Sequence, residues 1–276
     1  MTALEVLDVR VRAAMQDLGR AGLAHLGVPR AGAADRTSLR HANALVGNTE
    51  TAAAVEIVIG GLRVRCAGDV TAAVVGADWS VDGAQMPALH ARDIAAGSTI
   101  TVGAASGVYA YLAVAGGFDV VPTLGSRSSD TLSGIGPVPL AVGDVLPVGT
   151  RAGRTTAVEP IEPQDGPLRV VPGPRDDWFD ASALDRLLSS EWTVTPQSDR
   201  VGLRLSGPTL DRSRHDELPS EGMVPGAIQV PPDGQPIVFL ANHPATGGYP
   251  VLAVVVTPDV DRAAQHRPGA RLRFCT

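Results

Sequence analysis

The chain of 276 residues has 23 basic and 29 acidic side chains, a net charge of −6 and no lysine. This acidic balance argues against a nucleic-acid surface, which needs a clustered positive excess to neutralise phosphates. The missing lysine excludes Schiff-base chemistry and a phosphate-binding loop of the Walker type, because both require that side chain. We therefore expect small-molecule or protein partners, with anions held by arginine and main-chain N–H groups.

The composition also bounds the fold and the compartment. A content of 31 glycines and 22 prolines against 4% aromatic residues indicates many turns and few long helices, which favours an all-β fold. The apolar runs are far shorter than a membrane span, and the N-terminus lacks a basic stretch followed by an apolar one. We expect a cytoplasmic protein with no membrane contact. Cys66 and Cys275 have no metal-ligand spacing, so we expect reduced structural thiols and no metal site.

In the first half of the chain, one segment predicts a helix among predicted strands. Asp35 is a suitable N-cap for a helix over 36–46, and Gly47 is a suitable stop. Its apolar face would comprise Leu39, Ala42, Leu45 and Val46.

Strand periodicity follows directly after that helix. In "LRVRC", residues 62–66, the apolar side chains alternate with arginines, which is typical of a half-buried strand. Asp82-Gly83 predicts a tight hairpin turn, since glycine accepts the positive φ that such turns require.

The second half repeats this organisation. Asp180 or Ser182 is a candidate cap for a short helix, and Asp233-Gly234 predicts a second hairpin. Residues 151–167 lose apolar periodicity and gain Pro, Glu and Gly, which is typical of a linker. We therefore predict two domains, residues 1–165 and 166–276.

Polar clusters around glycine-rich turns are the candidate functional sites. In the first cluster, over residues 15–48, most polar residues are also natural caps and turn formers; its candidate ligand contacts are Arg20, Asp35, Asn43 and Asn48. Glu56 lies in an otherwise apolar strand, so its carboxylate is either paired with another group or functional, and the sequence leaves both readings open.

Two further clusters follow glycine-rich turns. Arg127 to Asp130 would form either an anion-binding nest or, as we favour, a solvated hairpin loop with an internal ion pair. Arg175 follows a strand that ends in Pro-Gly-Pro, where a planar guanidinium suits a carboxylate ligand, although it would also pair with its own neighbours Asp176 and Asp177.

The fourth cluster lies in the last third of the chain, between short predicted strands. Adjacent hairpins would bring a carboxylate, an imidazole and amides to one rim. A lone histidine in a loop is more often a surface residue than a base, so the role of His243 stays open. The candidates are Asp199, Arg200, Glu221, Gln229, Asn242, His243, Thr246, Gly247 and Tyr249.

Several segments together resemble the biotin-dependent carboxyltransferase-like family, also called allophanate hydrolase subunit 2. They are "MQDLGRAGLAHLGVPRAGAADRTSLRHANALVGN", "YLAVAGGFDVVPTLGSRSSDTLSG", "LRVVPGPRDDWF", "SDRVGLRLSGP" and "SEGMVPGAIQVPPDGQPIVFLANHPATGGYP". The resemblance implies two tandem cyclophilin-like β-barrel domains with a few short helices. It departs from the family pattern where Asn242 replaces an acid and Val251 a frequent lysine.

The resemblance also implies an activity and partners. We expect the C subunit of an ATP-dependent 5-oxoprolinase-like complex, an amidohydrolase that opens 5-oxoproline to glutamate. Its partners would be the neighbour-encoded B subunit, which is cyclophilin-like, and a third chain, the hydrolase A subunit. Glu56, Glu221 and His243 would handle protons, while the arginines and amides hold the substrate. The alternatives are a urea carboxylase-type carboxyltransferase that uses carboxybiotin on a separate carrier, and a non-enzymatic regulatory partner of a kinase-inhibitor-like subunit.

Overall fold

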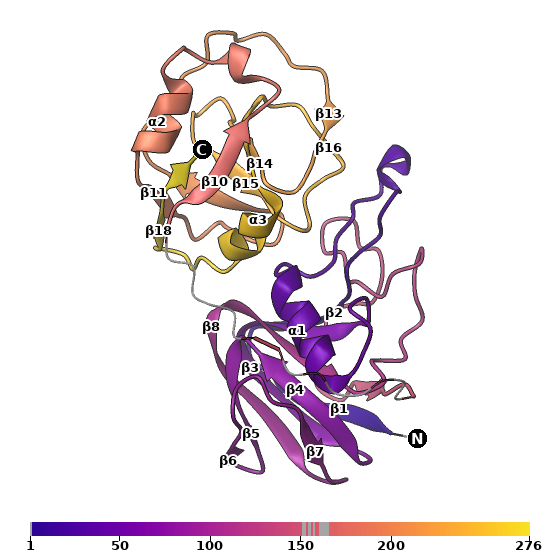
Figure 1. The fold of residues 1–276 in the computed structure, drawn as a ribbon. Coiled ribbons are helices and arrows are strands. Elements are labelled where there is room, and N and C mark those ends of the chain that lie inside the picture. Colours follow the sequence, from indigo (N-terminus) through magenta and orange to yellow (C-terminus); the bar gives the residue numbers. More distant parts are fainter. Residues whose placement is uncertain (1, 151–152, 154–155, 157, 160–165) are drawn as a thin grey trace. The chain divides into compact units, whose positions relative to one another are not determined.

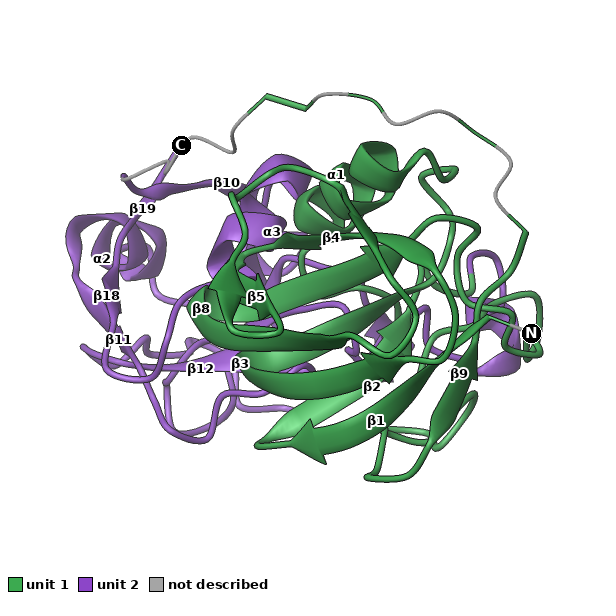
Figure 2. Cartoon of the chain, turned by 90° about the horizontal axis from the view of Figure 1, so that it is seen from below, with its two compact units in different colours: residues 1–20, 31–162 green, residues 21–30, 163–276 purple. Residues whose placement is uncertain are grey.

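The computed structural model describes residues 2–150, 153, 156, 158–159 and 166–276. Its chain forms two compact units (Figure 2): unit 1 comprises Met1–Arg20 with Ala31–Glu162, and unit 2 comprises Ala21–Arg30 with Pro163–Thr276. Most of the predicted linker over 151–167 lies outside the described residues, and the division into domains 1–165 and 166–276 stays a prediction. Each unit is mostly β with few helices, as expected from the composition (Figure 1).

Unit 1 is built on one nine-stranded sheet, in which the neighbouring strands run in the order β6-β5-β8-β3-β1-β9. In addition β2 pairs with β3, and β4 pairs with β7 and β8. The strands are β1 (Ala3–Val9), β2 (Arg12–Gln16), β3 (Ala54–Cys66), β4 (Val70–Val75), β5 (Ala77–Val81), β6 (Ala84–Gln85), β7 (Arg92–Ile94), β8 (Thr99–Val114) and β9 (Val145–Pro147).

The two longest strands, β3 and β8, form the centre of this sheet and bend together at a bulge between Val58 and Gly60. Gly60 has a φ of 91°, and a Cβ there would lie 1.8 Å from the carbonyl oxygen of Gly103 on β8. Only glycine allows this approach, so the bend is set by the sequence. The bend divides each long strand into two segments that pair with different neighbours.

The core of unit 1 confirms the predicted periodicity. Leu62, Val64 and Cys66 of β3 are buried, whereas Arg63 and Arg65 between them are exposed. The predicted hairpin is also present, because β5 and β6 pair on either side of Asp82-Gly83.

The predicted helix of unit 1 is α1 (Arg36–Val46), which buries its apolar face over β4 and β8 (Figure 1). The Asp35 side chain accepts a hydrogen bond from the N–H of Ser38, and Gly47 ends the helix in the left-handed conformation. Both boundary predictions are therefore confirmed.

Unit 2 contains an eight-stranded sheet in the order β18-β11-β12-β15-β14-β17-β10-β19, with a separate two-stranded ribbon of β13 and β16. All pairs are antiparallel except β10 with β19. The strands are β10 (Leu168–Pro172), β11 (Trp192–Val194), β12 (Gly202–Ser206), β13 (Glu221–Gly222), β14 (Ala227–Gln229), β15 (Ile237–Phe239), β16 (Thr246–Gly247), β17 (Val251–Val255), β18 (Arg271–Leu272) and β19 (Phe274–Cys275).

The α-helices of unit 2 are α2 (Ala183–Ser189) and α3 (Thr257–Ala264), and two short 3-10 helices span Ala24–Leu26 and Asp176–Trp178. Ser182 is the N-cap residue of α2, but its side chain makes no capping hydrogen bond. Helix α3 was not predicted from the sequence, although the expectation of a few short helices is confirmed. Within the described residues, no helix is long and apolar enough to cross a membrane.

Candidate functional site

In unit 1, the carboxylate of Asp17 organises the glycine-rich segment that carries Arg127. Oδ1 of Asp17 accepts hydrogen bonds from the hydroxyls of Ser126 at 2.6 Å and Ser128 at 2.5 Å, and from the N–H of Gly19 at 2.8 Å. Oδ2 accepts from the N–H of Arg127 at 2.6 Å. The carboxylate therefore forms hydrogen bonds inside the protein through both of its oxygens.

Arg20 fixes the same segment from the other side. It is almost fully buried, and its guanidinium donates to the carbonyl oxygens of Thr123 at 3.1 Å and Ser128 at 2.5 Å. Burial lowers the pKa of Arg20, while the carboxylates of Asp130 and Asp17 act in the opposite direction. Arg20 therefore acts in this structure as a cross-link between loops.

The expectation of a solvated loop over Arg127 to Asp130 was wrong. Ser128, Ser129 and Asp130 are all buried, because their polar groups bond to the β2 end of the chain and to local turns. The guanidinium of Arg127, which is only partly buried, donates to the carbonyl oxygen of Val120 at 2.6 Å. The segment is thus a fixed part of unit 1.

Glu56 is buried on β3, and its carboxylate is paired. Oε2 accepts from the hydroxyl of Tyr111 at 2.7 Å and from the N–H of Ala34 at 2.9 Å, while the Tyr111 oxygen accepts from the N–H of Asp35. Burial first, and the charge of Glu56 second, raise the pKa of Tyr111 well above its usual value, so it stays a hydrogen-bond donor. This network holds the entry to α1.

Asn43 and Asn48 close the other end of α1. Asn43 donates to the carbonyl oxygen of Ala52, and Asn48 donates both to the Asn43 side chain and to the carbonyl oxygen of Val114. The Asn48 side-chain oxygen accepts from the N–H of Gly116. These amides therefore stabilise the helix end and its loop.

In unit 2, Arg175 and Glu221 form an ion pair at a half-exposed position. The Nε of Arg175 lies 2.9 Å and 3.1 Å from the two carboxylate oxygens of Glu221, and Nη2 contacts Oε1 as well. The side chains are 37% and 25% exposed, so solvent and small molecules can reach the pair. The hydrogen bond from Arg175 lowers the pKa of Glu221, which is therefore ionised at neutral pH.

Glu221 is held by the two-stranded ribbon that also carries the Thr246-Gly247 segment. In this ribbon Glu221 lies opposite Gly247, and Gly222 lies opposite Thr246, which is exposed. The ribbon brings together residues that are 26 positions apart in the chain, as the predicted clustering requires. A carboxylate, a hydroxyl and a glycine backbone thus share one accessible strand pair.

Gln229 lies beneath this ribbon and supports its end. Its side-chain nitrogen donates to the carbonyl oxygen of Tyr249 at 2.9 Å, and a Cβ on Gly247 would lie 2.7 Å from the same nitrogen. Gly247 therefore has to be glycine for the amide to keep this position. The Tyr249 side chain remains 43% exposed beside the support.

His243 and Arg200 are buried rather than on an exposed rim. The Nδ1 of His243 lies 2.7 Å from the carbonyl oxygen of Pro244, which can only accept, so the proton is on Nδ1. The ring stacks on Phe239 with centroids 5.9 Å apart. The carbonyl oxygen of Arg200 accepts from the N–H of Asn242, which ties these two loops together.

Two residues of these networks were missed from the sequence. Tyr111 could have been found because its hydroxyl lies in the mainly apolar end of a predicted strand, where a buried hydroxyl needs a hydrogen-bond partner. Arg212 lies in a charged run that resembles an ordinary solvated loop, yet its guanidinium packs 5.6 Å from the centre of the Tyr249 ring and donates to the carbonyl oxygen of Val230. Burial lowers the pKa of Arg212.

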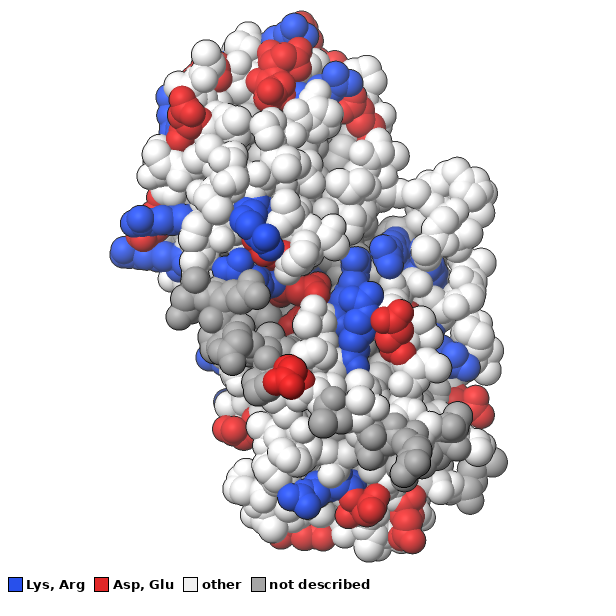
Figure 3. All heavy atoms as spheres, viewed as in Figure 1, with Lys and Arg blue, Asp and Glu red and all other residues white. Residues whose placement is uncertain are grey.

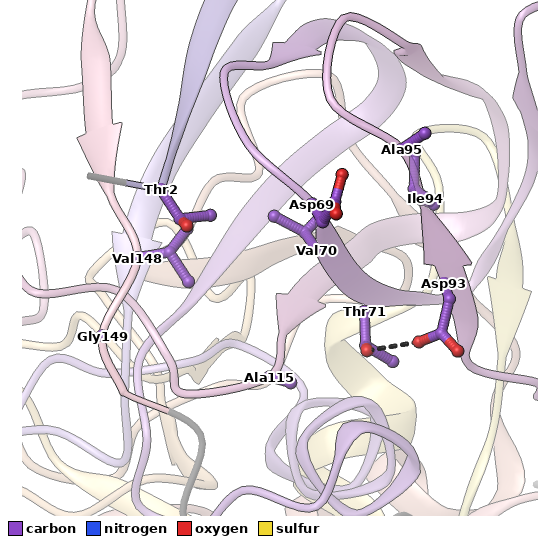
Figure 4. A pocket seen from close by; sticks show the side chains of 10 residues that line it. All are labelled: Thr2, Asp69, Val70, Thr71, Asp93, Ile94, Ala95, Ala115, Val148 and Gly149. Carbon is purple, nitrogen blue, oxygen red and sulfur yellow. Dashed lines mark hydrogen bonds between the residues drawn. The ribbon is translucent and has the colours of Figure 1, made fainter.

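A cavity of about 660 Å³ lies in unit 1 (Figure 4). Its polar wall contains Asp69 and Asp93, and Asp93 accepts a hydrogen bond from Thr71. None of the predicted ligand contacts lines this cavity. We take the ribbon of β13 and β16 in unit 2 as the candidate site, because the ion pair of Glu221 with Arg175 is partly exposed. On the face seen in Figure 3, arginine and acidic side chains are interspersed among uncharged residues.

Comparisons with known proteins confirm the family that the sequence resembles. Residues 26–276 match the family model described as "Carboxyltransferase domain, subdomain A and B". The chain is 36% identical to the C subunit of 5-oxoprolinase from Escherichia coli K12 and 34% identical to that from Haemophilus influenzae. Each of these alignments covers 98% of this chain and 90% of the relative.

More distant similarity extends to larger proteins. The urea amidolyase of Saccharomyces cerevisiae is 30% identical over 99% of this chain, which corresponds to 16% of that protein. The crystal structure of TTHA0988 superimposes on the whole of this chain with a TM-score of 0.89 at 36% identity. The chain spans 56% of TTHA0988, so that protein contains a large further segment.

Proposed function

Because the chain belongs to the carboxyltransferase domain family, subdomains A and B, we propose that it is the C subunit of an ATP-dependent 5-oxoprolinase-like complex. The observation that carries the proposal is end-to-end similarity to the C subunits of two 5-oxoprolinases, over 98% of this chain and 90% of theirs. We further propose that the two units are tandem cyclophilin-like barrels, which is consistent with their two large, mainly antiparallel sheets.

The proposed reaction opens a five-membered lactam: water adds to the amide carbonyl, the C–N bond breaks, and the nitrogen takes a proton. The substrate carries a carboxylate that needs a cationic partner. Arg175 suits this role, because its guanidinium is partly exposed and already holds a carboxylate, that of Glu221. An incoming substrate carboxylate would compete with Glu221 for the same guanidinium.

This competition would also change the chemistry of Glu221. While Arg175 donates to it, its pKa is lowered and it is a weak proton acceptor. Release from Arg175 would raise that pKa and make Glu221 a better base at the moment when substrate is bound. We therefore assign carboxylate binding to Arg175 and proton transfer to Glu221.

The neighbouring residues of unit 2 would shape the site around this pair. Thr246 and the backbone of Gly247 would contact the substrate from the ribbon, and Tyr249 would form an adjoining wall. Gln229 would position the Tyr249 backbone, and His243 would order the preceding loop. Both side chains are buried, so we give them positioning roles.

Residues of unit 1 would act by holding its loops in place. Five predicted residues bind main-chain groups or other buried side chains. They are Arg20, Asp35, Asn43, Asn48 and Glu56. Arg127 keeps a partly exposed guanidinium and stays a candidate contact to substrate or partner. Arg200 also stays a candidate contact. Its carbonyl oxygen accepts a hydrogen bond from the N–H of Asn242, which connects the two loops.

ATP binding and complex formation belong to the same proposal. Because the chain has no lysine and no phosphate-binding loop of the Walker type, we assign ATP binding to the partner A and B subunits. The test is reconstitution of the purified chain with both partners, with parallel measurement of 5-oxoproline consumption and ADP release. Coupled turnover that requires all three chains would support the proposal; no turnover in the complete mixture would contradict it.

A second candidate, a carboxyltransferase component for urea or a related amide, is favoured by the match to urea amidolyase along 99% of this chain. It requires a biotinylated carrier on another chain, because no lysine is present to carry biotin. Affinity capture from the source cells separates the two: co-purification of a biotinylated protein supports this candidate, and co-purification of the A and B subunits alone excludes it.

A further inference from the structure

Arg212 of unit 2 is a partly buried arginine that forms no ion pair with the described residues. Its Nη2 donates to the carbonyl oxygen of Val230, and its guanidinium carbon lies 5.6 Å from the centre of the Tyr249 ring. Its Nε is buried and has no hydrogen-bond partner within the described part of the chain. No carboxylate there lies within ion-pair distance of the guanidinium. Arg212 therefore retains an uncompensated charge and an unused N–H donor.

Arg214, two positions further along the chain, shows what is unusual about Arg212. It also packs on an aromatic ring, 5.9 Å from the centre of Trp178, but in addition it forms an ion pair with Asp177 at 3.3 Å. The Arg214 side chain is 53% exposed, whereas Arg212 is partly buried. A charge without a partner costs more free energy where water is excluded from it. Of these two arginines, the one with the greater need of an anion is therefore the one that lacks it among the described residues.

The electrostatic environment of Arg212 favours an anion beside it. Burial lowers its pKa, while the Tyr249 hydroxyl and the Asp233 carboxylate act in the opposite direction. Asp233 does so from beyond ion-pair distance, because its carboxylate is exposed and accepts a hydrogen bond from the N–H of Gln235. An arginine cannot be deprotonated in a protein, so the guanidinium stays charged in spite of its burial. An anionic ligand would offset the cost of that burial.

The chain places this charge beside the ribbon of β13 and β16. Strand β16 pairs with the strand that carries Glu221, and the first residue of β17 accepts a hydrogen bond from the N–H of Arg175. Tyr249 lies between these two contacts in the chain, so its backbone is close to both members of the ion pair. Its side chain is 43% exposed and packs on Arg212, so a small solute can contact the ring and the guanidinium together.

A carboxylate is the ligand group that suits this position, because the N–H donors of a guanidinium are spaced for its two oxygens. In the proposed reaction two carboxylates occur. The lactam brings one, and a second is created when water adds to the lactam carbonyl and the C–N bond breaks. Arg175 is assigned to the first, which leaves the second for Arg212.

We propose that Arg212 and the exposed Tyr249 ring form a second carboxylate-binding subsite of the ribbon site, which holds the carboxylate that ring opening creates. The identity of this ligand rests on the proposed function. With Arg175 at one carboxylate and Arg212 at the other, the site binds the opened, doubly charged form better than the lactam. The same guanidinium would favour the negative charge that develops on the carbonyl oxygen as water adds.

The test measures the binding of three ligands to the reconstituted complex by calorimetry without ATP. The ligands are 2-pyrrolidinone, 5-oxoproline and glutamate, which differ in carrying no carboxylate, a single one and a pair. We expect Arg212→Gln to weaken glutamate binding roughly tenfold, because a charge-assisted contact is lost, and to leave 2-pyrrolidinone binding unchanged.

Two further variants serve as controls for this measurement. Arg214→Gln is matched to Arg212→Gln, since Arg214 also packs on an aromatic ring, and it should change the binding of none of the three ligands. Arg212→Lys keeps the charge and should lose less affinity for glutamate than Arg212→Gln. Thermal melts of each chain establish that the variants are folded.

The outcomes separate failure of the subsite from failure of the proposed function. Weaker binding of glutamate alone supports the subsite with the carboxylate that ring opening creates, and equal weakening of 5-oxoproline supports it with the carboxylate that the substrate brings. Equal weakening of all three ligands would show that Arg212 only supports the Tyr249 ring, and unchanged binding of all three that it contacts no ligand; either result overturns the proposal. If the unmodified complex binds none of them, the proposed function is contradicted, and the subsite with it.

Discussion

The polar clusters of the two units use similar residues for different purposes. In unit 1, Asp17 and Glu56 are buried carboxylates whose bonds go to main-chain N–H groups and hydroxyls of the same unit. In unit 2, Glu221 lies on a two-stranded ribbon and forms a partly exposed ion pair with Arg175. The first arrangement fixes loops, and the second leaves charged groups accessible to a ligand.

This contrast shows what distinguishes a structural carboxylate from a candidate catalytic one. A buried carboxylate that accepts several hydrogen bonds is expensive to change and cannot leave its partners. A half-exposed ion pair contributes little to stability, so its two charged groups are free to serve another purpose, such as ligand binding. The following variants test whether stability and activity separate along this line.

The largest effect on stability is expected for Glu56→Ala. Removing this carboxylate leaves the N–H of Ala34 and the hydroxyl of Tyr111 buried without their acceptor, which costs about 3 kcal/mol in the free energy of unfolding. Chemical denaturation measures this change. Glu50→Ala is the matched control in the same unit, because Glu50 forms an exposed pair with Arg40 and its loss should cost less than about 0.5 kcal/mol.

Arg175→Lys should reduce turnover of the reconstituted complex by roughly 100-fold, because a lysine cannot present two parallel N–H groups to a carboxylate. The melting temperature should hardly change, since the pair is partly exposed. Arg65→Lys provides the control, as Arg65 pairs with Glu5 at an exposed position of unit 1. Equal turnover of Arg175→Lys and Arg65→Lys would show that Arg175 does not bind the substrate.

Lowering the pH should reduce the free energy of unfolding through a structural carboxylate of unit 2, that of Asp259. Hydrogen bonds from Arg169 lower the pKa of buried Asp259 to about 2, below its ordinary value near 3.8. The ionised form is thus favoured by folding, so this stabilisation of roughly 2 kcal/mol is complete above about pH 4 and is lost as the pH falls towards 2. In urea titrations, Asp259→Asn should remove this pH dependence, whereas Asp216→Asn, at an exposed position, should retain it.

The smallest effect concerns the ribbon itself. Gly247→Ala would place a Cβ 2.7 Å from the side-chain nitrogen of Gln229, which must move and release the Tyr249 backbone. We expect roughly a tenfold loss in kcat/KM. Gly222→Ala is the control on the paired strand, since a Cβ there meets no atom within 4 Å. Similar kinetics for the two variants would show that the support by Gln229 is unimportant.

Local features of the fold were predictable because they depend on neighbours in the chain. Asp35 and Gly47 define α1, and the alternation over 62–66 defines the inward face of β3. The inward carboxylate of Glu56 was recognised, but its partner Tyr111 lies on another strand, so the choice between pairing and catalysis needed the structure.

Features that depend on long-range contacts could not be predicted. The segment from Arg127 to Asp130 resembles a solvated loop until Asp17, more than a hundred residues earlier, supplies its acceptor. Arg212 is hidden in a charged run, and only the tertiary fold places its guanidinium over Tyr249. Helix α3 has only eight residues and no side-chain cap, so its local signal is weak.

The most direct test places Glu221→Gln and Glu56→Gln in the same reconstituted complex and measures turnover and the free energy of unfolding for each. We expect opposite results for the accessible ion pair and the buried network. Glu221→Gln should lose turnover and keep its stability. Glu56→Gln should lose stability and keep turnover in the folded fraction. Full turnover by Glu221→Gln, or inactive but stable Glu56→Gln, would contradict the assignment of the working site to unit 2.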